Sequence, residues 1–399
     1  STMVKVGEEF VRTEVQFIPA KLKVIDHYRE TYECRSCRKN GTPYMEKAPV
    51  PYPPVLHSLA SASTITWLIH QKFELSIPLY RQEKEWEALG LRLSRATMSN
   101  WLLVVYRDWL VHIVHRLKLE LLKQRYLHID ETHVQVLKEP GRKNTSDSYM
   151  WVYCSIRDAV NPIRYFEYQP GRSGKYPEAF LREYEGYIHT DAYSGYNAVS
   201  GVKRCLCYTH LRRAFVDALP KDIHNSEASK PAEAILRLNQ LFNIESELEA
   251  FPPDQKKKER LIREKPLLEA FWSWAEKSAI GELPKSKLSK AFHYALNNRE
   301  GFWNYLEDGN CSISNSLAEN CIRPFVIGRK NWLFSGSPKG AEASAGIYTL
   351  VETAKANGLA PMKYIKYILS DMPGSAFLEH PEYLDDYLPW NPLVKEFCR

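Results

Sequence analysis

Two short apolar stretches decide the fold, because each runs directly into an aspartate: Tyr126-Leu127-His128-Ile129-Asp130 and Tyr187-Ile188-His189-Thr190-Asp191. A third acid, Glu319, lies far downstream in a segment with the pattern of a short helix. An acid at the end of a buried strand is unfavourable unless it is paired or binds a metal ion. Two such acids from adjacent strands and a third from a helix can hold two divalent cations. We therefore predict that Asp130, Asp191 and Glu319 form one metal site.

The chain around these acids has the pattern of an α/β fold. Apolar residues alternate with a period of two, which predicts strands at 126–137, 149–156, 162–168, 187–190 and 202–206, with helices at 174–184 and 207–219. Three strands in series followed by alternating helix and strand favour a ribonuclease-H-like mixed sheet. The gap of 128 residues between the second and third acids (319 − 191) implies an inserted helical subdomain. We place the two parts of the core at 126–224 and 306–370, and the insertion at 225–305.

Other acids nearby are less suited to the site. Glu131 follows Asp130 directly, so its side chain points to the opposite face of the sheet. Glu342 and Glu352 are rival third acids, on a predicted helix at 341–356 whose apolar face fits core packing.

A helical region at 49–125 precedes the sheet and begins with the stiff, proline-rich linker Pro49–Pro54. Within it, a helix starting at Leu79, a turn containing Gly90, and a second helix at 95–105 with Ser94 as its cap make a helix-turn-helix pattern. An ordinary helical hairpin has the same pattern. Arg95, Thr97 and Asn100 are residue types that contact phosphates or base edges, so we predict DNA binding there.

Several motifs resemble one family of proteins. They are His128-Ile129-Asp130-Glu131-Thr132, Thr190-Asp191-Ala192-Tyr193-Ser194-Gly195-Tyr196-Asn197, Cys207-Tyr208-Thr209-His210-Leu211-Arg212-Arg213, Asn315–Glu319 with Arg323-Pro324, Gly328–Ser337, and Tyr387–Asn391. Nearly the whole chain is similar, in order, to the IS66-type (TnpC-like) insertion-sequence transposases of the DDE superfamily. The resemblance implies that Asp130, Asp191 and Glu319 are the catalytic acids. It also implies cleavage of insertion-sequence ends and their joining to target DNA, with Mg²⁺ or Mn²⁺ as cofactor, since hard cations prefer carboxylate oxygens.

The first 48 residues alternate in strand fashion and end in Cys34-Arg35-Ser36-Cys37. The resembling family has a zinc-binding segment here, so we interpret 1–48 as a truncated, zinc-ribbon-like β knuckle. Tetrahedral zinc needs four ligands, and only this one cysteine pair is present. We therefore predict no complete zinc site at Cys34 and Cys37, with strand pairing and Phe17, Val24 and Tyr32 holding the segment together.

Cations near the third acid are candidate DNA contacts. Arg323 lies four residues after Glu319, where either an ion pair or a phosphate contact is expected. Arg329, Lys330 and Trp332 could grip a strand and stack a base, or belong to a buried hairpin. Arg212 and Arg213 follow Cys207-x2-His210, which supplies only two possible metal ligands and is more simply explained by packing.

Charge and composition constrain the partners. The formal charge is only +6, but residues 81–125 hold nine Lys or Arg against five Asp or Glu, and the tail at 371–399 holds two against six. A basic front and an acidic tail favour a polyanionic partner, although ordinary surface variation gives the same pattern. No apolar run of 18 residues predicts a membrane span, and scattered cysteines favour a reducing cytoplasm.

Joining two DNA ends requires a homodimer or larger synaptic assembly, and the family resemblance implies accessory proteins of the same element. Two alternatives remain open: another nuclease of the same fold, and a domesticated DNA-binding protein without cleavage activity.

Overall fold

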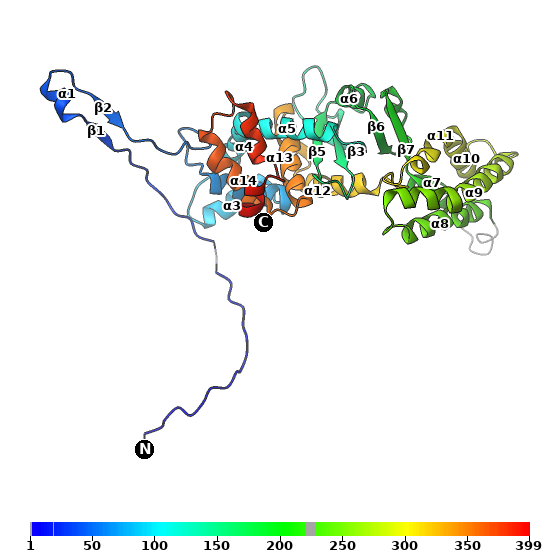
Figure 1. The fold of residues 1–399 in the computed structure, drawn as a ribbon, viewed down its shortest axis with the longest axis horizontal. Coiled ribbons are helices and arrows are strands. Elements are labelled where there is room, and N and C mark those ends of the chain that lie inside the picture. The colour runs from blue at the N-terminus through cyan, green and yellow to red at the C-terminus, as the bar shows by residue number, and fades with distance from the viewer. Residues whose placement is uncertain (1, 19, 221–228) are drawn as a thin grey trace.

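A computed structural model describes residues 2–18, 20–220 and 229–399. The predicted boundary between 224 and 225 lies outside these residues. The molecule is elongated, with a small N-terminal hairpin at one end, a sheet near the middle and a group of helices at the other end (Figure 1). In the described part of the chain, no helix is both long and apolar enough to cross a membrane.

The central sheet is mixed, as the sequence predicts. Its strands are β3 (Tyr126–Val136), β4 (Asp147–Ser155), β5 (Arg164–Gln169), β6 (Gly186–Thr190), β7 (Val202–Leu206) and β8 (Phe334–Ser335). The order is β5-β4-β3-β6-β7, and β8 pairs with the far end of β3. β3, β4 and β5 are antiparallel, whereas β6 and β7 run parallel to β3. The first three strands therefore form a meander, and the next two arrive by crossover connections.

The register between β3 and β6 positions the first two acids. Tyr126 pairs with Tyr187 and His128 with His189, so the same register places Asp130 beside Asp191. Asp191 is the first residue after β6, as expected. Asp130 lies inside β3, as the strand predicted at 126–137 implies, and not at the strand end that the apolar run before it suggests. β3 continues to Val136 because β4 pairs with it along most of its length. Its pairing with β6 ends earlier, at His128, two residues before Asp130.

Helices α6 (Lys175–Phe180) and α7 (Tyr208–Val216) connect and follow these strands, and both are shorter than predicted. The insertion comprises α8 (Lys230–Glu247), α9 (Pro253–Ala279), α10 (Lys287–Asn297), α11 (Arg299–Trp303) and a 3-10 turn, η5 (Asn304–Glu307). It has its own aromatic core, which includes Phe271, Trp272 and Phe292. The buried Arg260 guanidinium donates to both carboxylate oxygens of Glu245, at 2.6 and 2.8 Å, which joins α9 to α8. These helices lie beyond β7 (Figure 1).

The chain then returns to the sheet. The C-terminal elements are α12 (Ser316–Trp332), α13 (Pro338–Ala356), α14 (Pro361–Asp371), the 3-10 turns η6 (Met372–Gly374) and η7 (Pro381–Tyr387), and α15 (Pro392–Cys398). α12 packs on β3 and β4, and α13 packs on β5. The acidic tail is folded against the N-terminal helices, where the Arg116 guanidinium donates to Asp385 at 2.6 Å.

The N-terminal helical region contains α2 (Ala62–Ile69), the π-helix η1 (His70–Glu74), α3 (Leu79–Ala88), α4 (Arg95–Val105), the π-helix η2 (Tyr106–Leu110) and α5 (Val111–Leu122). Ser94 caps α4 by accepting the Thr97 N–H at 3.1 Å, as the sequence indicates. Gly90 turns the chain between α3 and α4 with φ +90°, a conformation that favours glycine. The two helices and the turn are therefore present at the predicted positions.

The first 48 residues differ from the expectation. Their described strands are only β1 (Thr31–Glu33) and β2 (Met45–Lys47), which flank α1 (Arg35–Lys39). Phe17 is 83% exposed, Val24 86% and Tyr32 59%, so they do not hold the segment together. The alternating pattern does not produce strands among the described residues 2–30, because no partner surface covers its apolar side chains.

Candidate active site

The three acids act on one another electrostatically. Asp130 accepts the Glu131 N–H at 2.9 Å and is half-buried. Burial, together with the charges of Glu131, Asp191 and Glu319, raises the pKa of Asp130 to about 7. Asp191 is anchored at the β6 terminus, where it accepts the Tyr193 N–H at 2.9 Å. The structure thus brings together three carboxylates whose mutual repulsion a cation would relieve.

Glu319 reaches the site from the first turn of α12. Among the described residues, its Oε1 atom is buried without a hydrogen-bond partner. His210 Nε2 lies 3.8 Å from this oxygen. Ligand atoms of Cys207, His210 and Glu319 all lie within 4.8 Å of one another. The sequence pattern offered two ligands, Cys207 and His210, and missed the third because it comes from a segment more than a hundred residues away.

A polar network fixes the segment that leads into α12. The buried Asn315 side-chain amide donates to the Ile129 carbonyl at 2.8 Å, and its Oδ1 lies 3.0 Å from His128 Nδ1. The Asn315 N–H donates to Cys207 Sγ at 3.1 Å. The start of α12 is therefore held against both β3 and the start of α7, four residues before Glu319.

Glu131 lies near these acids, since its charge raises the pKa of Asp130, and it has its own cation. Its carboxylate accepts from Arg172 at 2.6 Å and from the Tyr196 hydroxyl. The same guanidinium lies 3.9 Å from Asp191 and 3.9 Å from the Tyr193 ring centroid. Arg172 thus links the buried Glu131 to one of the three acids, a contact that the sequence pattern did not reveal.

A pocket of about 360 Å³ opens beside Asp191. Its lining includes Arg172, His210, Arg213 and, from the helical insertion, Tyr294. The predicted contact Arg213 therefore belongs to this site. Arg212 does not: it points toward α8, where it donates to Asn239 at 2.8 Å.

The remaining cations predicted near Glu319 lie along α12. Arg323 is exposed, and no ion pair joins it to Glu319 within the described residues. Arg329 donates to the Thr132 hydroxyl at 3.1 Å on β3, and Lys330 is exposed. All three side chains lie on α12, whose first turn carries Glu319.

Trp332 ends α12 and does not form part of a hairpin. Its ring packs against the position of Gly328 and lies 6.4 Å from the Tyr348 ring, with Lys72 Nζ 5.5 Å from its centroid. The ring of Trp332 is therefore half-buried, and its stacking on an unpaired base stays a prediction.

On α4, Arg95 and Asn100 are exposed, and Thr97 is half-buried because it lies next to the Ser94 cap. In the sequence, these residues precede Asp130 by at least 30 positions (130 − 100). Cys34 and Cys37 lie at the N-terminal hairpin, where Cys34 Sγ is 3.1 Å from Ser36 Oγ. In the part of the chain that the structure describes, no third His, Cys, Asp or Glu joins them in a metal-binding group.

Comparison with known proteins identifies the family. Residues 57–343 match the model of the transposase IS66 family, and residues 1–38 match the zinc-finger binding domain of transposase IS66. The second match includes Cys34 and Cys37, so the expectation that zinc is unlikely in this chain is not borne out.

Three similar proteins come from Sinorhizobium fredii (strain NBRC 101917 / NGR234). The uncharacterized protein y4hP is 26% identical over 98% of this chain and 72% of its own length. The uncharacterized protein y4jD is 26% identical over 94% and 74%, and y4qI is 27% identical over 97% and 72%. The family match spans the sheet, the insertion and all three acids, and the chain belongs to the IS66 family of transposases.

Proposed function

We propose that this transposase is a DDE enzyme, which cleaves the ends of its insertion sequence and joins them to target DNA. The observation that carries the proposal is the crowding of Asp130, Asp191 and Glu319. The β3–β6 register, continued two residues past its last pair, supports neighbouring positions for the two aspartates, and the charges of Asp191 and Glu319 both act on Asp130. A protein that only bound DNA would gain nothing from three adjacent carboxylates that repel one another.

The strand order supports a ribonuclease-H-like core. A three-stranded antiparallel meander is followed by two parallel strands on the other side of β3, and the third acid comes from a helix packed on β3 and β4. The insertion between β7 and α12 is then an addition to this core, and it supplies Tyr294 to the pocket beside Asp191.

The residues present fit a divalent cation. Asp130, Asp191 and Glu319 offer hard carboxylate oxygens, and Glu319 Oε1 is buried without a hydrogen-bond partner among the described residues. When bound, Mg²⁺ or Mn²⁺ supplies Lewis-acid polarisation of the scissile phosphate. Cys207 and His210 stand beside Glu319, and we propose that they orient its carboxylate toward the two aspartates.

Other side chains then bind and orient the nucleic acid. Arg172 and Arg213 line the pocket at Asp191, where a phosphate of the substrate would offset their charge. Arg323, Arg329 and Lys330 extend a row of cations along α12. Helices α3 and α4 form a proposed helix-turn-helix, with Arg95, Thr97 and Asn100 toward DNA. Paired cleavage of two ends implies at least a dimer, and we propose that two copies assemble on DNA.

A cleavage and strand-transfer assay tests the proposal. Labelled DNA carrying the end of the element is incubated with the full chain and Mg²⁺, with and without a chelator. We expect nicking at the element end, transfer of the free 3′-hydroxyl to a target plasmid, and no product when the chelator is present. Binding of the end DNA without any cleavage in Mg²⁺ or Mn²⁺ would instead support a domesticated DNA-binding protein.

A further inference from the structure

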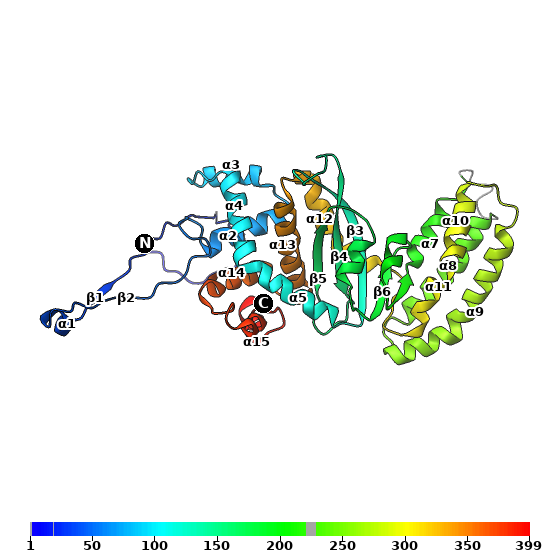
Figure 2. The same ribbon diagram turned by 90° about the horizontal axis from the view of Figure 1, so that it is seen from above.

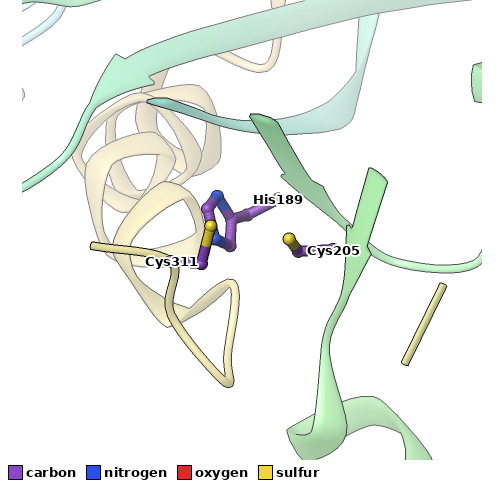
Figure 3. Close-up of side chains that lie close together, drawn as sticks. All are labelled: His189, Cys205 and Cys311. Atoms are coloured by element: carbon purple, nitrogen blue, oxygen red, sulfur yellow. The ribbon is translucent and has the colours of Figure 1, made fainter. Parts of the chain in front are cut away.

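Two buried cysteines meet where the chain returns from the insertion to the sheet. Cys205 lies on β7, and Cys311 lies in the loop between η5 and α12. Both are 1% exposed, and their sulfurs and a ring nitrogen of His189 all lie within 4.8 Å of one another (Figure 3). The segments that carry the two thiols are 106 residues apart (311 − 205).

Metal binding is one possible role of such a group, and the hydrogen bonds of His189 argue against it. The Ser312 N–H donates to His189 Nε2 at 2.9 Å, and His189 Nδ1 lies 3.1 Å from the Leu127 carbonyl, to which it donates. Both ring nitrogens are therefore engaged, and neither has a lone pair free for a metal ion. Two thiols alone do not complete a tetrahedral zinc site, and no fourth ligand joins the group among the described residues.

The two sulfurs interact with each other directly. A hydrogen bond from Cys205 and the neighbouring His189 together lower the pKa of Cys311 to about 6, against the opposing effect of burial. The Cys205 thiol keeps its proton, since the same hydrogen bond and its burial raise its pKa. One sulfur is thus the better nucleophile and the other the proton donor, which suits thiol–disulfide exchange.

Cys311 belongs to the segment that delivers Glu319. Directly after it, the Ser312 N–H binds His189, the Ile313 carbonyl accepts the Tyr208 N–H at 3.0 Å, and Asn315 binds β3 and Cys207. A covalent link at Cys311 would therefore fix this docking segment on β7.

We propose that Cys205 and Cys311 are an oxidisable thiol pair, which closes into a disulfide that locks the Glu319-bearing segment onto the sheet. The oxidant is a small-molecule disulfide. The Cys311 thiolate attacks one sulfur of this oxidant. A mixed disulfide forms at Cys311, and the other half of the oxidant leaves as a thiolate. The Cys205 sulfur then attacks Cys311, loses its proton to the second leaving thiolate, and closes the protein disulfide. In total, two protein thiols are oxidised and one small disulfide is reduced to two thiols.

The link to Glu319 rests on the proposed function, but formation of the bond does not. We would treat the folded full chain with oxidised glutathione, block the remaining thiols by alkylation, and digest with trypsin without reduction. The expected product joins the peptide of residues 205–212 to that of residues 300–329. Each peptide also contains a second cysteine, Cys207 or Cys321, so fragment ions must assign the bond to Cys205 and Cys311.

A second pair makes this assignment necessary. Cys154 on β4 and Cys321 on α12 also share a hydrogen bond. Cys321→Ser is the matched control, and the 205–311 bond should form in it as in the wild type. Cys205→Ala should abolish the bond, and if this variant fails to fold, the wild-type peptide map still decides the question.

Oxidation should also raise the unfolding temperature of the wild type, reversibly on addition of a dithiol reductant, and leave that of Cys205→Ala unchanged. Alkylation of both Cys205 and Cys311 after prolonged oxidation, with no cross-linked peptide, would overturn the proposal. A zinc ion at this site would also overturn the proposal. Elemental analysis would then find one zinc per chain in the wild type and in Cys34→Ser, but none in Cys205→Ala. Loss of cleavage activity in every form, with the bond present, would count against the proposed function and not against the thiol pair.

Discussion

At the scale of the residue, Asp130 bears a large electrostatic cost, because burial and three neighbouring carboxylates all oppose its ionisation. Its pKa in the folded chain is about 7, against about 3.8 in an exposed aspartate. At a pH between these two values, the folded state therefore keeps the Asp130 proton, whereas the unfolded state has lost it. Above the folded pKa both states are ionised and the folded state carries the whole penalty, on the order of 2–4 kcal/mol.

We expect the metal-free protein to lose stability as pH rises from about 4 to about 7, and Asp130→Asn to reduce this loss. Urea unfolding across that range, with a chelator present, gives the free energy of unfolding for both proteins. Glu185→Gln is a suitable control, since Glu185 is an exposed acid outside the site. Equal pH dependence in wild type and Asp130→Asn would contradict the crowding described here.

The role of Asp191 is tested by replacing only its charge. Asp191→Asn keeps the shape of the side chain but removes the carboxylate, so we expect cleavage to fall by roughly 100-fold or more while binding of end DNA stays close to wild type. Asp217→Asn is the matched control, because Asp217 lines the same pocket at its exposed edge. Cleavage at the wild-type rate by Asp191→Asn would exclude Asp191 as a ligand.

The neighbouring positions of Asp130 and Asp191 could be predicted from the sequence, because each follows an apolar run. Glu319 follows no such run, and its role as the third acid stays a prediction. The strand predicted at 126–137 already contained Asp130, and β3 matches it closely because β4 pairs with it along most of its length. The contacts of Glu319 with His210 and of Arg172 with Glu131 join residues far apart in the chain. No local pattern encodes such pairs.

At the scale of the element, α3 and α4 are the proposed DNA-reading unit. Arg95 is exposed at the first turn of α4, so Arg95→Ala should weaken DNA binding and reduce the salt slope of log K by about 0.9, the value for one phosphate contact. A fluorescence titration of end DNA at several salt concentrations measures both. Arg92→Ala, an exposed cation in the preceding turn, is the control. An unchanged slope for Arg95→Ala would favour a plain helical hairpin.

Helix α13 makes an unusually close contact with the π-helix η2. A Cβ atom at Gly346 would lie 2.0 Å from the Tyr106 ring, which is too close for any side chain without movement of that ring. We expect Gly346→Ala to destabilise the protein by about 1–3 kcal/mol. Gly336→Ala is the control, since no atom lies within 4 Å of a Cβ built there. Denaturant unfolding compares the two, and equal stabilities would show that Tyr106 moves freely.

Most elements after residue 57 follow the sequence closely, because long periodic patterns and caps such as Ser94 specify them locally. The N-terminal segment does not, since an alternating pattern becomes a strand only where another strand or a core covers it. Periodicity alone could not reveal that the described residues before β1 lack such a partner. The helical character of the insertion was predictable, whereas its contribution of Tyr294 to the pocket at Asp191 was not.

At the scale of the whole molecule, the sheet connects two helical regions with different proposed tasks (Figure 2). The N-terminal helices pack with α13, α14 and the acidic tail, and the insertion packs beyond β7. The acids lie between them, where β3, β6 and α12 meet. DNA held by α3 and α4 could therefore reach the acids along the row of cations on α12.

One measurement tests the central claim most directly: anomalous diffraction from crystals of the full chain soaked in Mn²⁺. We predict Mn²⁺ coordinated by oxygens of Asp130, Asp191 and Glu319, in a two-metal site with ions about 3.5–4 Å apart once DNA is bound. Weak or absent peaks at the acids in Asp191→Asn crystals should accompany this result. Mn²⁺ bound elsewhere, with the three carboxylates more than about 10 Å apart, would contradict the proposal that these acids form the catalytic centre.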